Sequence, residues 1–234
     1  MATAKASAID IKAPEFGIAE ITIVGTTPLV VHSWDDKARQ MILDKQTGTK
    51  KGAKHEIKIP VNDFMNSLYW LTQKPENGKD NEEAMDKMNH AIEDGAKFGF
   101  PCNGIKAAII SGAYRAGLDV KMSELRGTFF IEGATSSSTI DIAEIVSPNP
   151  PRMREDMVRV GGMSKSADVR YRAEFEQWEI PLRFKYLKSS KYTFEQLLNM
   201  IPYGGFVTGI GEWRPEKNGQ FGMFELGKQV MTIE

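Results

Sequence analysis

The clearest alternation of apolar and polar positions lies in residues 179–186. Ile180, Leu182, Phe184 and Tyr186 alternate there with polar or charged residues and one proline. A period of two places the apolar side chains on one face, which predicts a strand with one buried face. Other apolar or alternating runs predict strands at 21–24, 29–31, 128–131, 139–142, 205–208, 220–226 and 229–233.

Apolar residues recur at helical spacing mainly in the first half of the chain. They predict helices at 62–71, 81–92 and 103–116. Ser33 can cap one more helix, with Asp35 and Asp36 in its first turn. Near the end of the chain, Thr193 and Gln196 form a capping box that predicts a helix over the following residues.

The predicted elements follow the order β, helical block, β, β, α, β. This is the order of a ferredoxin-like α+β domain, which the RNA-recognition-motif fold shares. We therefore expect a ferredoxin-like (RRM-type) β-α-β-β-α-β core in a single domain over 18–234. A large helical insertion at about 34–117 and a protruding β-hairpin at about 148–173 are expected to extend the core. Residues 1–17, small and polar, are expected to form a flexible N-terminal arm.

The composition is that of an ordinary globular protein. The 234 residues are 41% hydrophobic, enough for a core without disulfides or metals. A net charge of −1 excludes a uniformly basic protein and leaves local basic patches open. Cys102 is the one cysteine, which suits a reducing compartment. No run reaches the ~20 apolar residues of a membrane span and no signal peptide is evident, so we expect a cytoplasmic protein without membrane contact.

Positive charge is concentrated in two segments. The loop 45–58 is rich in lysine and glycine, and it is either a solvated connector or a phosphate-contacting loop with Lys50, Lys51 and Lys54 as contacts. The hairpin 148–173 holds six basic residues against three acids, and arginine suits bidentate phosphate contacts. Its alternatives are a solvated hairpin or a subunit contact. The predicted contacts here are Arg152, Arg154, Arg159, Lys165, Arg170 and Arg172, with Arg183 and Lys185 on the polar face of 179–186.

A glycine-rich stretch at 209–222 is the sharpest local motif. Gly209 and Gly211 allow close approach of another backbone or a phosphate, Trp213 offers a stacking face, and Arg214 and Lys217 offer positive charge. No Gly-Lys-Ser/Thr follows, so the stretch is not a Walker loop. The alternative is a β-hairpin whose glycines serve turn geometry alone.

This stretch, placed after the second helix of a ferredoxin-like unit, resembles the motif of the CRISPR-associated RAMP superfamily. That motif runs Gly-x-Gly, a basic residue, a spacer and Gly-aromatic-Gly, and it is matched by Gly209, Gly211, Arg214, Gly219, Phe221 and Gly222. Gly25-Thr-Thr-Pro-Leu29 resembles the first strand and turn of such proteins. The resemblance implies a backbone-type subunit that binds single-stranded nucleic acid, RNA favoured over DNA, and self-associates along the strand.

The chain also resembles uncharacterised proteins encoded by phages and prophages, which implies the host cytoplasm as its location. In that setting a second function stays open, a phage assembly or host-takeover protein that binds a protein partner. Trp34, Trp178 and Trp213 would then be interface anchors.

A third possibility is a ribonuclease. Some RAMP proteins cleave RNA with a histidine after the first strand, and His32 follows the run 29–31. The spacing supplies no second base and no Lys or Tyr partner, so we expect a non-catalytic protein. No Cys/His cluster is present and adjacent acidic residues point apart, so we expect neither a metal nor a cofactor.

Overall fold

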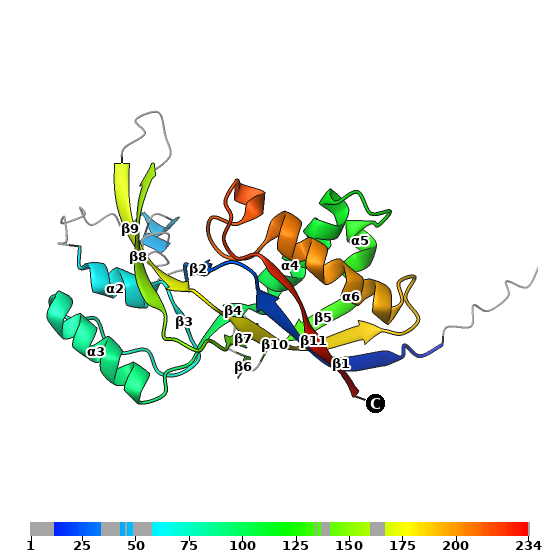
Figure 1. The fold of residues 1–234 in the computed structure, drawn as a ribbon, viewed down its shortest axis with the longest axis horizontal. Helices are drawn as coiled ribbons and strands as arrows, with labels where there is room; N and C mark the ends of the chain where they lie inside the picture. The colour runs from blue at the N-terminus through cyan, green and yellow to red at the C-terminus, as the bar shows by residue number, and fades with distance from the viewer. Residues whose placement is uncertain are drawn as a thin grey trace, which may run out of the picture.

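A four-stranded antiparallel sheet forms the centre of the computed structural model, which describes residues 12–33, 43–44, 46–48, 58–133, 135–136, 141–159 and 167–233. Its strands lie in the order β11-β1-β10-β5 (Figure 1). Their bounds are β1 Phe16–Gly25, β5 Phe129–Glu132, β10 Glu179–Leu187 and β11 Phe224–Ile233. Each strand is antiparallel to its neighbours.

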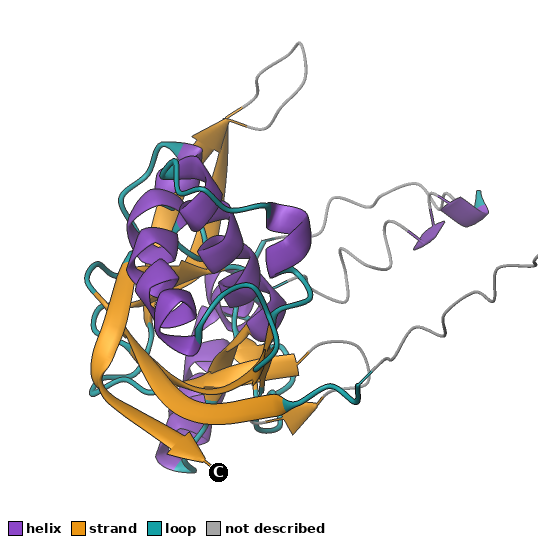
Figure 2. Cartoon of the chain, turned by 90° about the vertical axis from the view of Figure 1, so that its right-hand side faces the viewer, coloured by secondary structure: helices purple, strands orange, loops and turns teal. Residues whose placement is uncertain are grey.

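The helices of the core lie on one face of this sheet. On β10 the alternation confirms the prediction, since Ile180, Leu182 and Phe184 are buried. The helices α4 (Cys102–Arg115), α5 (Met122–Leu125) and α6 (Phe194–Tyr203) lie on this side, inside the curve of the strands (Figure 2). The capping box of Thr193 and Gln196 is present at the start of α6, as predicted.

A second sheet, in the order β2-β9-β8, carries the protruding hairpin. Its strands are β2 (Leu29–Val31), β8 (Arg152–Arg159) and β9 (Ala167–Phe175). In Figure 1 the hairpin of β8 and β9 projects beyond the neighbouring elements. The structure therefore contains a hairpin where the sequence predicted one, and its tip at 160–166 lies outside the described residues.

The predicted helical insertion also contains strands, which is a correction. Next to α2 (Pro60–Asn66) and α3 (Asn81–Glu93), the strands β3 (Tyr69–Trp70) and β4 (Phe98–Pro101) form a third sheet with β7 (Asp141–Ile145) and β6 (Thr135–Ser136). A four-residue buried run shows no period, so the sequence pattern missed β4.

The helix predicted over 62–71 is also shorter than expected. It ends at Asn66, where Ser67 Oγ donates to the Phe64 carbonyl at 2.7 Å. The Trp70 indole turns back to donate to the Met65 carbonyl at 2.8 Å and packs edge-on against Phe98. The helix predicted after Ser33, with Asp35 and Asp36, lies outside the described residues.

The segment predicted as a strand at 205–208 is instead a π-helical turn, η1 (Gly204–Thr208). It continues α6 because both glycines permit very close packing. A Cβ at Gly204 would lie 2.6 Å from the Ile109 Cα, and one at Gly205 would lie 1.7 Å from the Phe224 carbonyl oxygen. After the 3-10 turn η2 (Pro215–Lys217), the two predicted terminal strands are one strand, β11, whose pairing with β1 is irregular near Ile21.

The α+β class with antiparallel sheets is confirmed. The described residues share one hydrophobic core that includes residues of the central sheet, of α4 and α6, and of the β3–β4 region. No described helix is both long and apolar enough to span a membrane.

Candidate nucleic-acid interface

One face of the β8–β9 hairpin is made almost wholly of charged side chains. The strand register places Arg152 opposite Glu174 and Arg154 opposite Arg172. Side chains alternate along a strand, so these residues share a face. Three charged residues of this face are buried, with exposed fractions of 1% for Glu174, 3% for Arg172 and 7% for Asp156.

The buried charges form a continuous ion-pair network. Arg152 Nε donates to Glu174 Oε1 at 2.9 Å, and Arg154 Nη1 donates to Glu174 Oε2 at 2.8 Å. Arg154 Nε donates to Asp156 Oδ1 at 2.7 Å, and Arg172 Nη1 reaches Asp156 Oδ2 at 3.4 Å. The hydrogen bond that Arg152 donates to the Glu174 carboxylate raises the pKa of the Arg152 guanidinium. Because buried charges are costly unless paired, Arg154 and Arg172 compensate the buried carboxylates of the hairpin, although Arg172 Nε has no hydrogen-bond partner among the described residues.

The other predicted hairpin cations are less tightly engaged. The Arg152 side chain is 60% exposed in spite of its bond to Glu174. Arg170 pairs with Asp168 at 3.6 Å, and its side chain is 38% exposed. The side chain of Arg159 and the whole of Lys165 lie outside the described residues, as do Lys50, Lys51 and Lys54 of the first basic segment.

The glycine-rich loop folds back against residues 28–31. Gly222 N donates to the Pro28 carbonyl at 2.7 Å, and Glu212 N donates to the Val30 carbonyl at 2.8 Å. Gly209, Gly211 and Gly222 have φ angles of 67°, 77° and 65°, which favour glycine. A Cβ at Gly211 would lie 2.3 Å from the Val30 carbonyl oxygen. The glycines therefore serve close packing of the loop backbone.

Trp213 is presented to solvent by this loop in a left-handed backbone conformation. Its φ is 53°, and the residue is 40% exposed. Its carbonyl oxygen accepts a hydrogen bond from Phe221 N at 3.1 Å. A Cβ at Gly219 would lie 1.6 Å from that oxygen, so only a glycine at position 219 lets the two sides of the loop come this close. The tight loop thus fixes the position of a half-exposed indole.

The side chain of Arg214 forms its hydrogen bonds within the loop. Its Nε and Nη2 donate to Glu216 Oε2 at 3.0 and 2.7 Å, and its Nη1 donates to the Gly211 carbonyl at 2.9 Å. Arg115 of α4 pairs with Glu216 Oε1 at 2.9 Å while its side chain stays 50% exposed. Hydrogen bonding from Arg214 lowers the pKa of Glu216. Lys217 is exposed and, within the described residues, is in no salt bridge.

Arg115 is a cation of this region that the sequence analysis missed. It lies about one hundred residues before the loop in the chain, so no local motif connects them. Helix α4 places Arg115 beside the loop, and a cleft of about 240 Å³ lies between α4 and the loop. Ser111 and Thr208 line this cleft, and Thr208 Oγ1 is buried without a hydrogen-bond partner among the described residues.

The charged hairpin and the glycine-rich loop are in contact. The Arg154 guanidinium lies over the Phe221 ring, 4.5 Å from its centre, and Arg172 Nη2 lies 3.7 Å from Glu212 Oε2. The structure therefore brings together two segments that the sequence predicted separately.

His32 lies at the end of β2 and is exposed. The Tyr69 hydroxyl donates to the His32 backbone carbonyl at 3.3 Å. Burial, followed by the charge of Glu212, raises the pKa of Tyr69, so its phenol stays protonated at neutral pH. This contact uses the backbone of His32, and Tyr69 is a neighbour that spacing alone could not have named.

Arg183 and Lys185 lie on the opposite side of the central sheet from the helices. Arg183 Nε pairs with Glu132 Oε2 at 3.1 Å, and Lys185 Nζ lies 4.0 Å from Glu132 Oε1. Since Ile180, Leu182 and Phe184 face the helices, the intervening residues face away from them. These two predicted contacts are therefore on the open face of the sheet.

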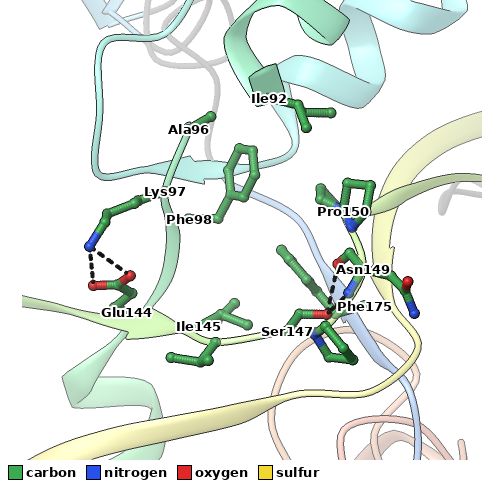
Figure 3. A pocket seen from close by; sticks show the side chains of 13 residues that line it. Ile92, Ala96, Lys97, Phe98, Glu144, Ile145, Ser147, Asn149, Pro150 and Phe175 are labelled. Atoms are coloured by element: carbon green, nitrogen blue, oxygen red, sulfur yellow. Dashed lines mark hydrogen bonds and ion pairs between the residues drawn. The ribbon is translucent and has the colours of Figure 1, made fainter. Parts of the chain in front are cut away.

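A second recess, of about 280 Å³, lies beside β4 (Figure 3). Ile92, Phe98 and Ile145 give it apolar walls, and the Lys97–Glu144 ion pair at 3.0 Å lies at one side. None of the unpaired buried polar atoms found in the described residues lines it. Its polar lining residues bond to one another: Lys97 pairs with Glu144, and Ser147 Oγ donates to the Asn149 carbonyl at 2.8 Å.

No protein-family model and no curated protein matches the chain. Similar solved structures include a chain from the cryo-EM structure of the Type III-B Cmr-beta bound to cognate target RNA. The TM-score is 0.42 and the sequence identity 12%, and the match covers 94% of this chain and 61% of that chain. This chain therefore spans less than two thirds of the length of that similar chain.

Proposed function

We propose that this protein is a non-catalytic module that binds single-stranded nucleic acid, RNA in preference to DNA, across the glycine-rich loop and the adjoining hairpin. The observation that carries the proposal is Trp213, a residue that is 40% exposed although its backbone is held at a φ of 53°. A non-glycine residue costs about 1–2 kcal/mol in the left-handed region. Such strain concentrates at functional sites, and an exposed aromatic ring is a stacking surface for a base.

The charges around Trp213 suit the backbone of a strand. Arg115 and Lys217 keep exposed cationic groups beside the loop, while Arg214 is directed into the loop by Glu216. On the hairpin, Arg152 and Arg170 are the exposed cations that adjoin this surface. Phosphate contacts from such side chains position a strand without reading its sequence, and stacking on the indole adds affinity for any base.

We also propose that β1, α4, β5, β10, α6 and β11 are the six elements of a ferredoxin-like core. Their chain order is β-α-β-β-α-β, and the strand order β11-β1-β10-β5 supports it. The RAMP resemblance supports the same assignment, and with it the binding of repeated copies along one strand.

Binding of a protein partner through exposed tryptophans is less well supported. Trp178 is 3% exposed, and its indole donates to the Thr27 carbonyl at 2.8 Å, so it is a core residue. Trp34 lies outside the described residues. Of the three tryptophans considered as anchors, Trp213 is the one that the described structure exposes.

The proposal is tested by fluorescence anisotropy of a labelled single strand of roughly 30 nucleotides, RNA and DNA in parallel, at low and high salt. We expect binding that weakens steeply as salt rises, with RNA bound more tightly. The double variant Arg115→Ala, Lys217→Ala should bind more weakly and show a shallower salt dependence. Lys74→Ala, at a lysine outside this surface, is the matched control. Absence of binding to both strands at low salt overturns the proposal.

A further inference from the structure

The open face of the central sheet presents a row with apolar side chains on β11, β1 and β5 and with Lys185 on β10. The register places Ile233, Ile18, Lys185 and Phe130 side by side, from β11 through β1 and β10 to β5. Phe130 is 53% exposed and Ile233 is 40% exposed. The opposite face of the same strands is buried under the helices, so this row faces away from the core.

Two further apolar side chains extend this row. Phe16 precedes Ile18 by two residues on β1 and is 51% exposed, and Met231 precedes Ile233 by two residues on β11 and is 58% exposed. Lys185 lies over the Phe16 ring at 5.1 Å, and Lys106 of α4 reaches Phe130 at 3.7 Å. Exposed apolar side chains gathered on one face in this way mark an interaction site in a folded protein.

The neighbouring row carries balanced charge. Met231, Glu20, Arg183 and Glu132 lie opposite one another across the same four strands. With Lys185, these two rows therefore hold two cations and two carboxylates, while Glu179 and Glu225 lie farther along the same face, opposite Val24. Glu132 is shared by Arg183 and Lys185, and no described cation lies within ion-pair distance of Glu20. A polyanion requires a net positive surface, so this face is poorly suited to nucleic acid.

We infer that a second copy of this chain packs on this face, sheet against sheet, about a two-fold axis. In such an interface the same patch meets itself, so a contact between residues of the two copies occurs twice. The two rows hold equal numbers of cations and carboxylates, so they can form ion pairs with the same two rows of a second copy. Glu20 of one copy pairs with Lys185 of the other, while the apolar rows pack between the sheets as in a β-sandwich.

The size of the face determines the strength of the dimer. Seven residues of strand by four strands span about 23 Å by 19 Å, or roughly 440 Å² of flat surface per copy. A standard stable interface contributes about 800 Å² per partner. The contact is therefore smaller than that of a permanent dimer, and we expect dissociation in the micromolar range.

Sedimentation velocity of the full chain without nucleic acid, from roughly 1 µM to roughly 300 µM, tests the inference. We expect a monomer–dimer equilibrium. Met231→Glu should weaken it by about tenfold or more, because it places a charge in the apolar interface. Met157→Glu is the matched control, since Met157 is 83% exposed on the hairpin. Equal thermal midpoints of the two variants show that both are folded.

A charge reversal provides the second, independent test. Glu20→Lys and Lys185→Glu should each weaken the dimer, and the double variant should restore it to within about threefold of the starting constant. A monomer at all concentrations overturns the inference, as does a dimer unchanged by Met231→Glu or a double variant no better than the single ones. If the parent is monomeric and Met231→Glu loses single-strand binding, this face binds nucleic acid. That result also overturns the inferred dimer. The dimer is measured without nucleic acid, so this result does not depend on the proposed function.

Discussion

The guanidinium carbon of Arg154 lies 4.5 Å from the centre of the Phe221 ring. Arg154 belongs to the hairpin, and Phe221 belongs to the glycine-rich loop. The same guanidinium is bonded to Glu174 and Asp156, so Arg154, which the sequence predicted as a phosphate contact, connects two parts of the interface. The orientation of the hairpin beside Trp213 therefore depends on a buried ion-pair network.

Glu174→Gln should destabilise the fold by about 2–4 kcal/mol, because two arginines lose their shared carboxylate. The loss is below that of a fully buried pair, since the Arg152 side chain is 60% exposed. Urea unfolding measures the change. Asp168→Asn, at an exposed pair with Arg170, is the control and should cost less than about 1 kcal/mol. Equal losses in the two variants would show that burial of the network is unimportant.

Local patterns were enough to predict several elements. The alternation in 179–186 predicted β10, and Thr193 with Gln196 predicted the start of α6, because both depend on neighbouring residues. The burial and ion pairing of the hairpin arginines could not be predicted from local patterns. Counting charges treats Arg172 as an available cation, but its burial depends on packing among β2, α2 and the loop, which sequence spacing does not encode.

The tightness of the glycine-rich loop leads to a prediction about its glycines. Gly222 and Gly117 both have positive φ, 65° and 78°. A Cβ at Gly222 would lie 1.8 Å from the Ile210 carbonyl oxygen, whereas one at Gly117 meets nothing within 4 Å. Gly117→Ala should therefore cost about 1–2 kcal/mol for its backbone conformation alone. Gly222→Ala should cost at least about 2 kcal/mol more and weaken strand binding. Equal unfolding midpoints would contradict this.

The ion pairs of Glu216 predict a dependence on pH. Hydrogen bonding from Arg214 lowers its pKa below the ordinary value of 4.5. A lowered pKa in the folded state gives stability that is complete above the unfolded value and is lost as pH falls through the folded one.

Glu216→Gln should therefore lower the free energy of unfolding by about 1–2 kcal/mol at pH 7, and the difference from the parent should shrink below pH 4.5. Urea midpoints measured across this range are the readout. Glu225→Gln, at an exposed carboxylate of β11, is the control. If the difference in free energy of unfolding between Glu216→Gln and the parent grew as pH fell, the direction assigned to the Glu216 pKa shift would be wrong.

Trp213 allows stability and binding to be separated. Trp213→Ala removes the indole but keeps a Cβ at a φ of 53°, whereas Trp213→Gly removes both the ring and the strain. Both variants should bind a single strand roughly 5- to 100-fold more weakly, the effect of losing one stacked base, with little change in salt dependence.

In urea unfolding, Trp213→Gly should be more stable than Trp213→Ala by about 1 kcal/mol. Trp213→Phe keeps an aromatic face and should retain most of the binding. If Trp213→Ala bound as tightly as the parent, the exposed indole would not be a stacking surface and the proposed function would lose its main support. If the glycine variant were the less stable one, the backbone of the loop would have rearranged, and the strain argued for Trp213 would not exist.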